Sequence, residues 1–125
     1  MHTRYRDIDA FTTKDGSEIR ELMHPSRHDV RRQSLAEASV PAGGKTLLHR
    51  HVRTEEIYYI LHGAGRMTLG DNEFDVMAGD TVCIAPGTAH CIENTGQSVL
   101  TILCACSPAY EDSDTVLLDD SVHGQ

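Results

Sequence analysis

Apolar residues recur along this chain in short runs, and turn signals interrupt the runs roughly every 8–12 residues, a spacing typical of an all-β sandwich or barrel. The turn signals include KDGS from residue 14, PAGG from residue 41 and APGT from residue 85. Between the turns, the runs predict strands over residues 17–23, 34–40, 46–51, 56–61, 65–69, 73–77, 81–84, 90–93 and 98–105. The pattern therefore predicts an all-β fold.

Local signals refine this picture at three places. Gly70-Asp71-Asn72 predicts a tight hairpin between the strands at 65–69 and 73–77. No segment has a sustained helical period, and HPSRHDVRRQS at 24–34 is the best candidate for a short helical turn. The last fifteen residues, EDSDTVLLDDSVHGQ, are acidic, and we expect them to form a loosely attached tail.

Composition bounds the possible partners and the location. A chain of 125 residues is expected to form one domain. With 19 acidic against 11 basic residues and no basic cluster longer than Arg31-Arg32, nucleic acid and anionic membranes are poor partners. The N-terminus lacks an apolar signal-peptide core, and no run reaches the ~20 apolar residues of a membrane helix. We expect a cytoplasmic protein with reduced cysteines.

The stretch HRHVRTEEIYYI, residues 49–60, combines ionisable side chains with an apolar strand pattern. His49 and His51 would lie about 200° apart on a helix, but on a strand they share one face. In the next strand Glu56 is in phase with apolar positions, although either Glu55 or Glu56 could turn inward. His90 opens a further strand. Buried polar groups of this size require a partner.

A metal ion is a partner that would make this burial tolerable. Three imidazoles and one carboxylate suit a borderline transition metal such as iron, manganese, nickel or zinc. An octahedral ion with four protein ligands keeps two positions open for substrate or water. The residue types therefore predict one divalent transition metal ion per chain.

Two glycine-bounded segments resemble the two sequence motifs of the cupin family, and in particular small single-domain bacterial cupins of the RmlC-like type. The first motif consists of Gly43, His49, His51, Glu56 and Gly63. The second motif consists of Gly79, Ala85, Gly87, His90 and Asn94. Cupins normally have proline at the position of Ala85, whereas here proline follows at Pro86. The resemblance covers about residues 34–106.

The resemblance implies a single antiparallel β-barrel of the jelly-roll type, also called a double-stranded β-helix, which is usually dimeric. It implies that His49, His51, Glu56 and His90 are the metal ligands, with Glu56 preferred over Glu55. It also implies three segments along the chain. These are an N-terminal segment that contributes to the barrel or the dimer, a core barrel and an acidic tail, at residues 1–33, 34–106 and 107–125.

Further residues near the motifs are candidates for roles beyond metal binding. Tyr58 is in phase with Glu56 and could donate its hydroxyl group to a substrate, or it could simply pack in the core. Glu55 is a candidate acid–base residue, and Arg53 in the intervening turn could meet an anionic substrate. Cys104 and Cys106 are spaced like a metal-binding pair, but core packing explains them better.

The resemblance predicts metal binding without choosing a reaction, because the same ligands serve many reactions. The first hypothesis is a metal-dependent enzyme acting on a small molecule, with dioxygenase chemistry slightly ahead of sugar isomerase or epimerase chemistry (mannose-6-phosphate isomerase-like) and of decarboxylase or lyase chemistry. The alternative of another class is a non-catalytic module that binds a small ligand. A homodimer is expected, because the strands at 17–23 and 34–40 leave edges that a partner chain commonly covers.

Overall fold

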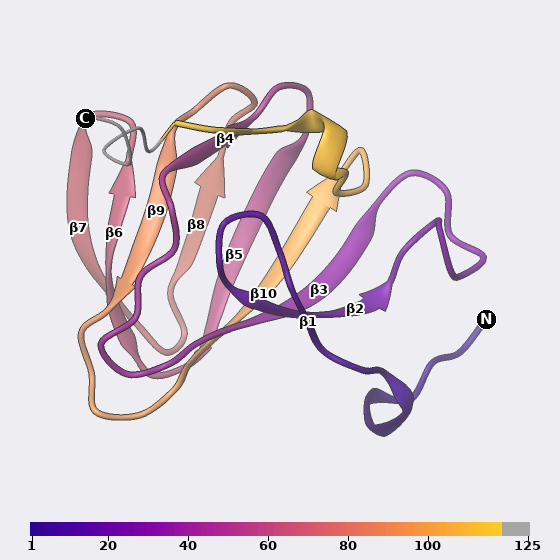
Figure 1. Ribbon diagram of the computed structural model, residues 1–125, viewed down its shortest axis with the longest axis horizontal. Helices are drawn as coiled ribbons and strands as arrows, with labels where there is room; N and C mark the ends of the chain where they lie inside the picture. The colour runs from indigo at the N-terminus through magenta and orange to yellow at the C-terminus, as the bar shows by residue number, and fades with distance from the viewer. Residues whose placement is uncertain (119–125) are drawn as a thin grey trace.

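The computed structural model describes residues 1–118 and consists of two antiparallel β-sheets that face each other (Figure 1). The six-stranded sheet has the order β1 (Phe11–Thr12), β2 (Glu18–Met23), β3 (Ser34–Val40), β10 (Leu100–Ser107), β5 (Glu55–His62) and β8 (Thr81–Ile84). The five-stranded sheet has the order β11 (Thr115–Leu117), β4 (His49–His51), β9 (His90–Asn94), β6 (Ala64–Leu69) and β7 (Asn72–Met77). Two short 3-10 helices, Tyr5–Asp7 and Asp112–Asp114, complete the described elements. The predicted all-β jelly-roll fold is confirmed.

The core lies between the two sheets and is built by the alternation of side chains along each strand. In β5, every second residue from Glu56 to Ile60 is buried, while the residues between them are exposed. The largest fully buried apolar side chains come from both sheets and are Ile60, Met67, Ile84, Ile92, Leu100 and Ile102. Glu56 therefore occupies a position in the core row of its strand.

All nine predicted strands are present, with bounds shifted by no more than three residues. The predicted hairpin is confirmed: β6 and β7 pair with Leu69 opposite Asn72, and Gly70 has the positive φ of +60° that the turn requires. The strand predicted at 46–51 is shorter, because only His49–His51 pairs as β4. Residues 24–28 form a hydrogen-bonded turn, with the N–H groups of Arg27 and His28 donating to the carbonyl of His24, and no helix.

The C-terminal segment is packed on the domain as far as the structure describes it, so the predicted loose tail is wrong for residues 112–118. β11 pairs with β4, which places Thr115 opposite His51. The buried Asp114 carboxylate accepts hydrogen bonds from the backbone N–H groups of Arg53 and Thr54. Asp114, which the acidic sequence pattern suggests is solvated, therefore holds this segment against the domain. The remainder of the tail prediction lies outside the described residues.

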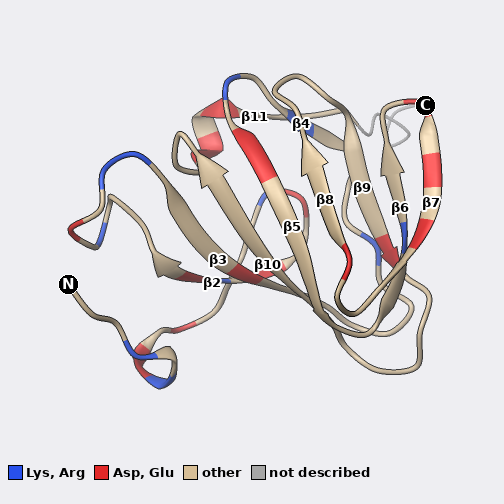
Figure 2. Cartoon of the chain, turned by 180° about the vertical axis from the view of Figure 1, so that it is seen from behind, with Lys and Arg blue, Asp and Glu red and all other residues tan. Residues whose placement is uncertain are grey.

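Charged residues gather at strand ends, in loops and along β7 (Figure 2). β7 is an edge strand, and its Glu73 and Asp75 form ion pairs with Arg66 of β6. Charges on an edge discourage pairing with further strands. None of the helices within residues 1–118 is long and apolar enough to cross a membrane.

Candidate metal centre

Three histidines converge in the interior from two neighbouring strands. His49 and His51 lie on the inward face of β4, and the register pairs His49 with His90, the first residue of β9. One nitrogen from each ring lies within 4.8 Å of the corresponding nitrogens of the other two. All three side chains are buried. The spacing seen in the sequence therefore corresponds to one shared cluster.

Glu56 reaches this cluster from the opposite sheet. Its Oε1 atom lies 3.2 Å from Nε2 of His51 and 3.6 Å from Nε2 of His90. Oε1 of Glu56 and Nε2 of His90 are buried, and neither has a hydrogen-bond partner among residues 1–118. The other carboxylate oxygen, Oε2, accepts a hydrogen bond from the Cys106 thiol at 3.5 Å.

The hydrogen bonds of His49 and His90 fix which ring nitrogen carries the proton. Nδ1 of His49 lies 2.8 Å from the carbonyl oxygen of Leu47, and Nδ1 of His90 lies 2.9 Å from that of Thr88. A carbonyl oxygen can only accept, so each Nδ1 donates. In the neutral rings, Nε2 is therefore left with an unprotonated lone pair.

His51 is held in the same tautomer through a hydroxyl group. Its Nδ1 atom lies 3.0 Å from Oγ1 of Thr115 in β11. Thr115 donates its own proton to the carbonyl oxygen of Glu111 at 2.9 Å, so it accepts from His51. Such outer hydrogen bonds are what orient metal-ligating histidines in proteins.

These tautomers direct three Nε2 lone pairs into one shared space, and the Glu56 carboxylate lies beside those of His51 and His90. Like-signed partial charges brought together in a buried site need a cation between them. Two ligands bound at right angles to one ion, with bonds of about 2.1 Å, would lie about 3.0 Å apart. The 3.2 Å between His51 and Glu56 is close to this value. The donor set therefore fits a divalent transition metal ion.

The electrostatics of the site keep its ligands in metal-binding form. Burial acts to raise the pKa of Glu56, but the adjacent His51 and His90 rings, when they carry a proton on Nε2, lower that pKa to about 2. Burial, together with the neighbouring His90, lowers the pKa of His49. At neutral pH, Glu56 is thus a carboxylate and His49 is uncharged, the forms in which both residues bind metal.

Asp15 is a residue of this site that the sequence analysis missed. Its Oδ2 atom lies 3.6 Å from Nε2 of His49. Its Oδ1 atom accepts hydrogen bonds from Oγ1 of Thr13 and from the N–H and hydroxyl groups of Ser17. The backbone N–H of Leu47 donates to the carbonyl of Asp15, which ties the β1–β2 turn to the strand that carries His49. In the sequence, KDGS signals only a turn.

The cluster borders a cavity of about 40 Å³, which is room for roughly three water molecules. One side is polar, with His49, His51, Glu56 and Asp15. Small and apolar side chains from the six-stranded sheet form another side, and they include Ile19, Ala36, Ala38, Ile102 and Cys104. The cavity can therefore hold a small molecule next to a metal ion.

The other predicted site residues lie in different surroundings. Tyr58 is buried and lines the cavity, and its ring centroid is 6.1 Å from that of His90. Glu55 is exposed and does not line the cavity, so the structure does not place an acid–base group there. The Arg53 side chain is 74% exposed and lies beside Asp114, not in the cavity. Cys104 and Cys106 are free, buried thiols on the cavity wall.

Comparisons with known proteins give matches over most of the chain. The cupin domain family model, Cupin_2, matches residues 36–106. The chain is 54% identical over 119 residues to the uncharacterized protein MJ1618 of Methanocaldococcus jannaschii, covering 95% of each chain. It is 33% identical over 86 residues to an oxalate-binding protein of Thermotoga maritima, covering 69% of this chain and 71% of that one.

A solved structure has a similar fold. The crystal structure of a predicted oxalate decarboxylase from Thermotoga maritima superposes with a TM-score of 0.73 and 27% sequence identity. The match covers 86% of this chain and 99% of that chain. The similarity therefore extends over nearly a whole small protein of comparable architecture.

Proposed function

Because this chain belongs to the cupin domain family, we propose that it is a metal-dependent protein that acts on a small molecule. One divalent transition metal ion is held by His49, His51, His90 and Glu56. The observation that carries the proposal is the cluster of three buried histidine rings, two of which place Nε2 within 3.6 Å of the buried Glu56 carboxylate. Glu56 supplies negative charge to the site, and the imidazoles supply borderline ligands.

The metal leaves room for a small molecule in this arrangement. Four protein ligands leave two positions of an octahedral ion open, and a bound ion would act as a Lewis acid or, if it is iron, support oxygen chemistry. The chain's own groups define the rest of the site. Asp15 sets the charge on the His49 side, while Tyr58 forms part of the wall and offers a hydroxyl group to the ligand.

A small carboxylate is the ligand class that the site and the comparisons support best. A carboxylate oxygen suits an open position on a divalent ion, and the cavity beside the histidines is sized for a small molecule. The relative that is 33% identical is named for oxalate binding. The same relative supports the second candidate function, which is capture of a small carboxylate without turnover.

The functional unit extends beyond the predicted core barrel of residues 34–106. Asp15 comes from the N-terminal segment at residues 1–33, and Thr115, which orients His51, comes from the C-terminal segment at residues 107–125. We expect a fragment restricted to the core to lose metal affinity, because it would lack both residues.

Elemental analysis tests the metal site. The protein is purified without added metal or chelator, beside a His49→Ala, His51→Ala variant and a His62→Ala control, in which an exposed histidine on the same chain is removed. One equivalent of metal in the wild type and the control, and none in the double variant, is expected. Equal metal in all three proteins would refute the ligand assignment.

The metal that is found also orders the reaction classes. Iron would favour dioxygenase chemistry, whereas manganese, nickel or zinc would favour decarboxylase, lyase or sugar isomerase chemistry. Incubating the loaded protein with oxalate, while following oxygen consumption and formate release, separates turnover from binding. Saturable binding with no product would support the capture function.

A homodimer and a cytoplasmic location complete the proposal. The outer face of the six-stranded sheet exposes a set of large apolar side chains, namely Leu35, Ile57, Tyr59 and Leu61. The register aligns Leu35, Ala105 and Ile57 across β3, β10 and β5, so these side chains form a continuous patch. Such patches are typical of protein interfaces. The four free cysteines support a reducing compartment.

A further inference from the structure

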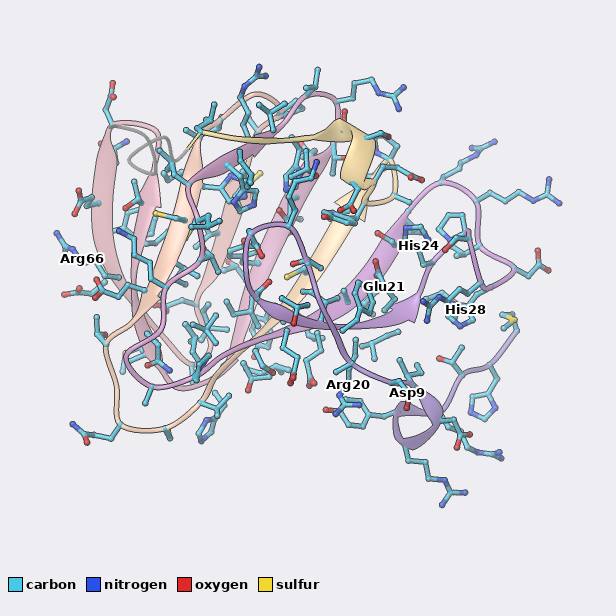
Figure 3. All side chains as sticks on the ribbon, viewed as in Figure 1. Asp9, Arg20, Glu21, His24, His28 and Arg66 are labelled. Carbon is cyan, nitrogen blue, oxygen red and sulfur yellow. The ribbon has the colours of Figure 1, made fainter. Side chains whose placement is uncertain are left out.

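A second carboxyl group lines the cavity far along the sheet from the histidine cluster. Glu21 lies on the inward face of β2, is only 7% exposed and borders the same cavity as His49. Figure 3 shows it beside His24, with His28 farther along the turn that follows β2. The metal site proposed above does not use any of these three residues.

Glu21 lacks the partner that a buried carboxyl group normally has. Its Oε1 atom is fully buried and has no hydrogen-bond partner among residues 1–118. Unsatisfied buried polar atoms are uncommon in folded proteins and are often explained by a missing ligand or water molecule. The side chain therefore points to a group that occupies the cavity.

His24 is the nearest ionisable neighbour, but its hydrogen bonds are directed elsewhere. Nδ1 of His24 accepts from the backbone N–H of Ser26, so the ring proton is on Nε2. Nε2 donates to the carbonyl oxygen of Tyr110 at 2.7 Å, whereas Oε2 of Glu21 is 4.0 Å away. His24 thus holds the turn against the C-terminal segment and leaves Glu21 unsatisfied.

The surroundings favour the neutral acid form of Glu21. Burial raises its pKa, nearby Glu111 raises it further, and His24 and Arg27 offset part of the rise. The register places Ala36 of β3 beside Glu21 and Cys104 of β10 beyond Ala36. Cys104 and Cys106 of β10 are buried thiols, and burial raises their pKa values. They therefore bring no positive charge to this end of the cavity.

We propose that Glu21 is a second anchoring point in the cavity, at which its protonated carboxyl group donates a hydrogen bond to an oxygen atom of a small ligand whose other end lies at the histidine cluster. This inference rests on the proposed metal site as the first anchor. The ligand class that fits both anchoring points is a carboxylic acid with a second oxygen acceptor, such as a carboxylate or carbonyl group, at its far end.

The strand order sets a lower limit on the length of this ligand. Glu21 on β2 and Glu56 on β5 are separated by β3 and β10. Because neighbouring strands lie about 4.8 Å apart, the backbones of β2 and β5 are separated by about 14 Å along the sheet. The ligand is therefore expected to be longer than oxalate.

A length series of simple acids tests the proposal. Unbranched dicarboxylates from oxalate to adipate, and monocarboxylates of the same chain lengths, are titrated into the zinc-loaded full chain by calorimetry. One dicarboxylate longer than oxalate is expected to bind about tenfold more tightly than its monocarboxylate counterpart, the gain expected of one additional buried hydrogen bond. Glu21→Leu should abolish this gain, whereas Glu21→Gln, whose amide still donates, should keep most of it.

Infrared spectroscopy gives a readout that does not depend on binding. A carbonyl stretch of a protonated carboxylic acid is expected to persist in the wild type at pH values above 4.5, where an ordinary glutamate is ionised, to be lost in Glu21→Gln and to be shifted by the best dicarboxylate. The absence of that band, or a length preference that survives Glu21→Leu, would overturn the proposal. Binding of all acids without length preference would refute the role of Glu21 alone. No binding of any acid to the metal-loaded protein would refute the carboxylate assignment and this inference together.

Discussion

Oδ2 of Asp15 lies 3.6 Å from Nε2 of His49, although Asp15 belongs to the turn between β1 and β2 and His49 to a strand of the other sheet. Three hydrogen bonds to Oδ1 hold the Asp15 side chain in this position. A fixed carboxylate on one side of the metal position increases the affinity of the site for a cation.

Asp15→Asn is therefore expected to lower metal affinity about tenfold, a loss typical of an outer partner of a metal ligand. Competition between the protein and a chelator of known affinity measures the change. Asp71→Asn, in the exposed β6–β7 turn, removes the same charge from a position where solvent screens it, and should leave the affinity nearly unchanged. Equal effects of the two variants would mean that only net charge matters.

Glu55 and Glu56 provide a matched pair for the carboxylate ligand. Glu56→Gln should reduce metal affinity by more than the roughly 10–100-fold typical of an outer-shell partner, because it removes the one carboxylate that faces His51 and His90. Glu55→Gln, one residue away on the exposed face of β5, should bind metal like the wild type. A larger loss in Glu55→Gln would contradict the proposed ligand set.

Thr115 should affect the metal site without touching the metal. Thr115→Val keeps the shape of the side chain but removes the acceptor that holds Nδ1 of His51, so metal affinity is expected to fall about 10- to 100-fold. Thr115→Ser restores a hydroxyl group and should recover most of the affinity. If valine and serine behave alike, the hydrogen bond does not orient His51.

The stability of the metal-free protein should report on Glu21. Its pKa is raised above the ordinary glutamate value of about 4.5, so at pH values between the ordinary and the raised pKa the folded chain holds a proton that the unfolded chain has lost. Stability from this group is present at low pH and is lost as the pH rises through the folded pKa. In urea with chelator present, Glu21→Gln should unfold at higher denaturant concentration than the wild type at pH 8, with no difference near pH 4. A pH-independent difference would contradict the raised pKa.

The apolar patch on the outer sheet face should control assembly. Ile57→Asp places a charge at its centre and is expected to convert a homodimer into monomers, measured by light scattering. Met77→Asp alters an exposed apolar residue on the edge strand β7 and should leave the dimer intact. A wild-type protein that is monomeric at every concentration would refute the dimer.

Strand periodicity predicted the part of the site that depends on local sequence. His49 and His51 share a face because they are two residues apart on a strand, and the same phase puts Glu56 inside and Glu55 outside. The motif spacing then added His90. These inferences needed only the identity of each strand and the position of each residue within it.

The rest of the site depends on contacts between segments that are distant in sequence. Asp15 and Thr115 reach the histidines because the short strands β1 and β11 pair at the edges of the two sheets. Strands of two and three residues are too short to show alternation. Glu21 looked like an ordinary polar position in a strand, because its burial depends on the strands and turn that enclose it.

The pairing of β11 with β4 also determines when the metal site can be completed during synthesis of the chain. His49, His51 and Glu56 are translated well before Thr115, whose hydroxyl group fixes the tautomer of His51. A nascent chain that has not yet released β11 from the ribosome therefore carries the histidines without their full support. We expect stable metal uptake to follow translation of the C-terminal segment, so that loading coincides with the final step of folding.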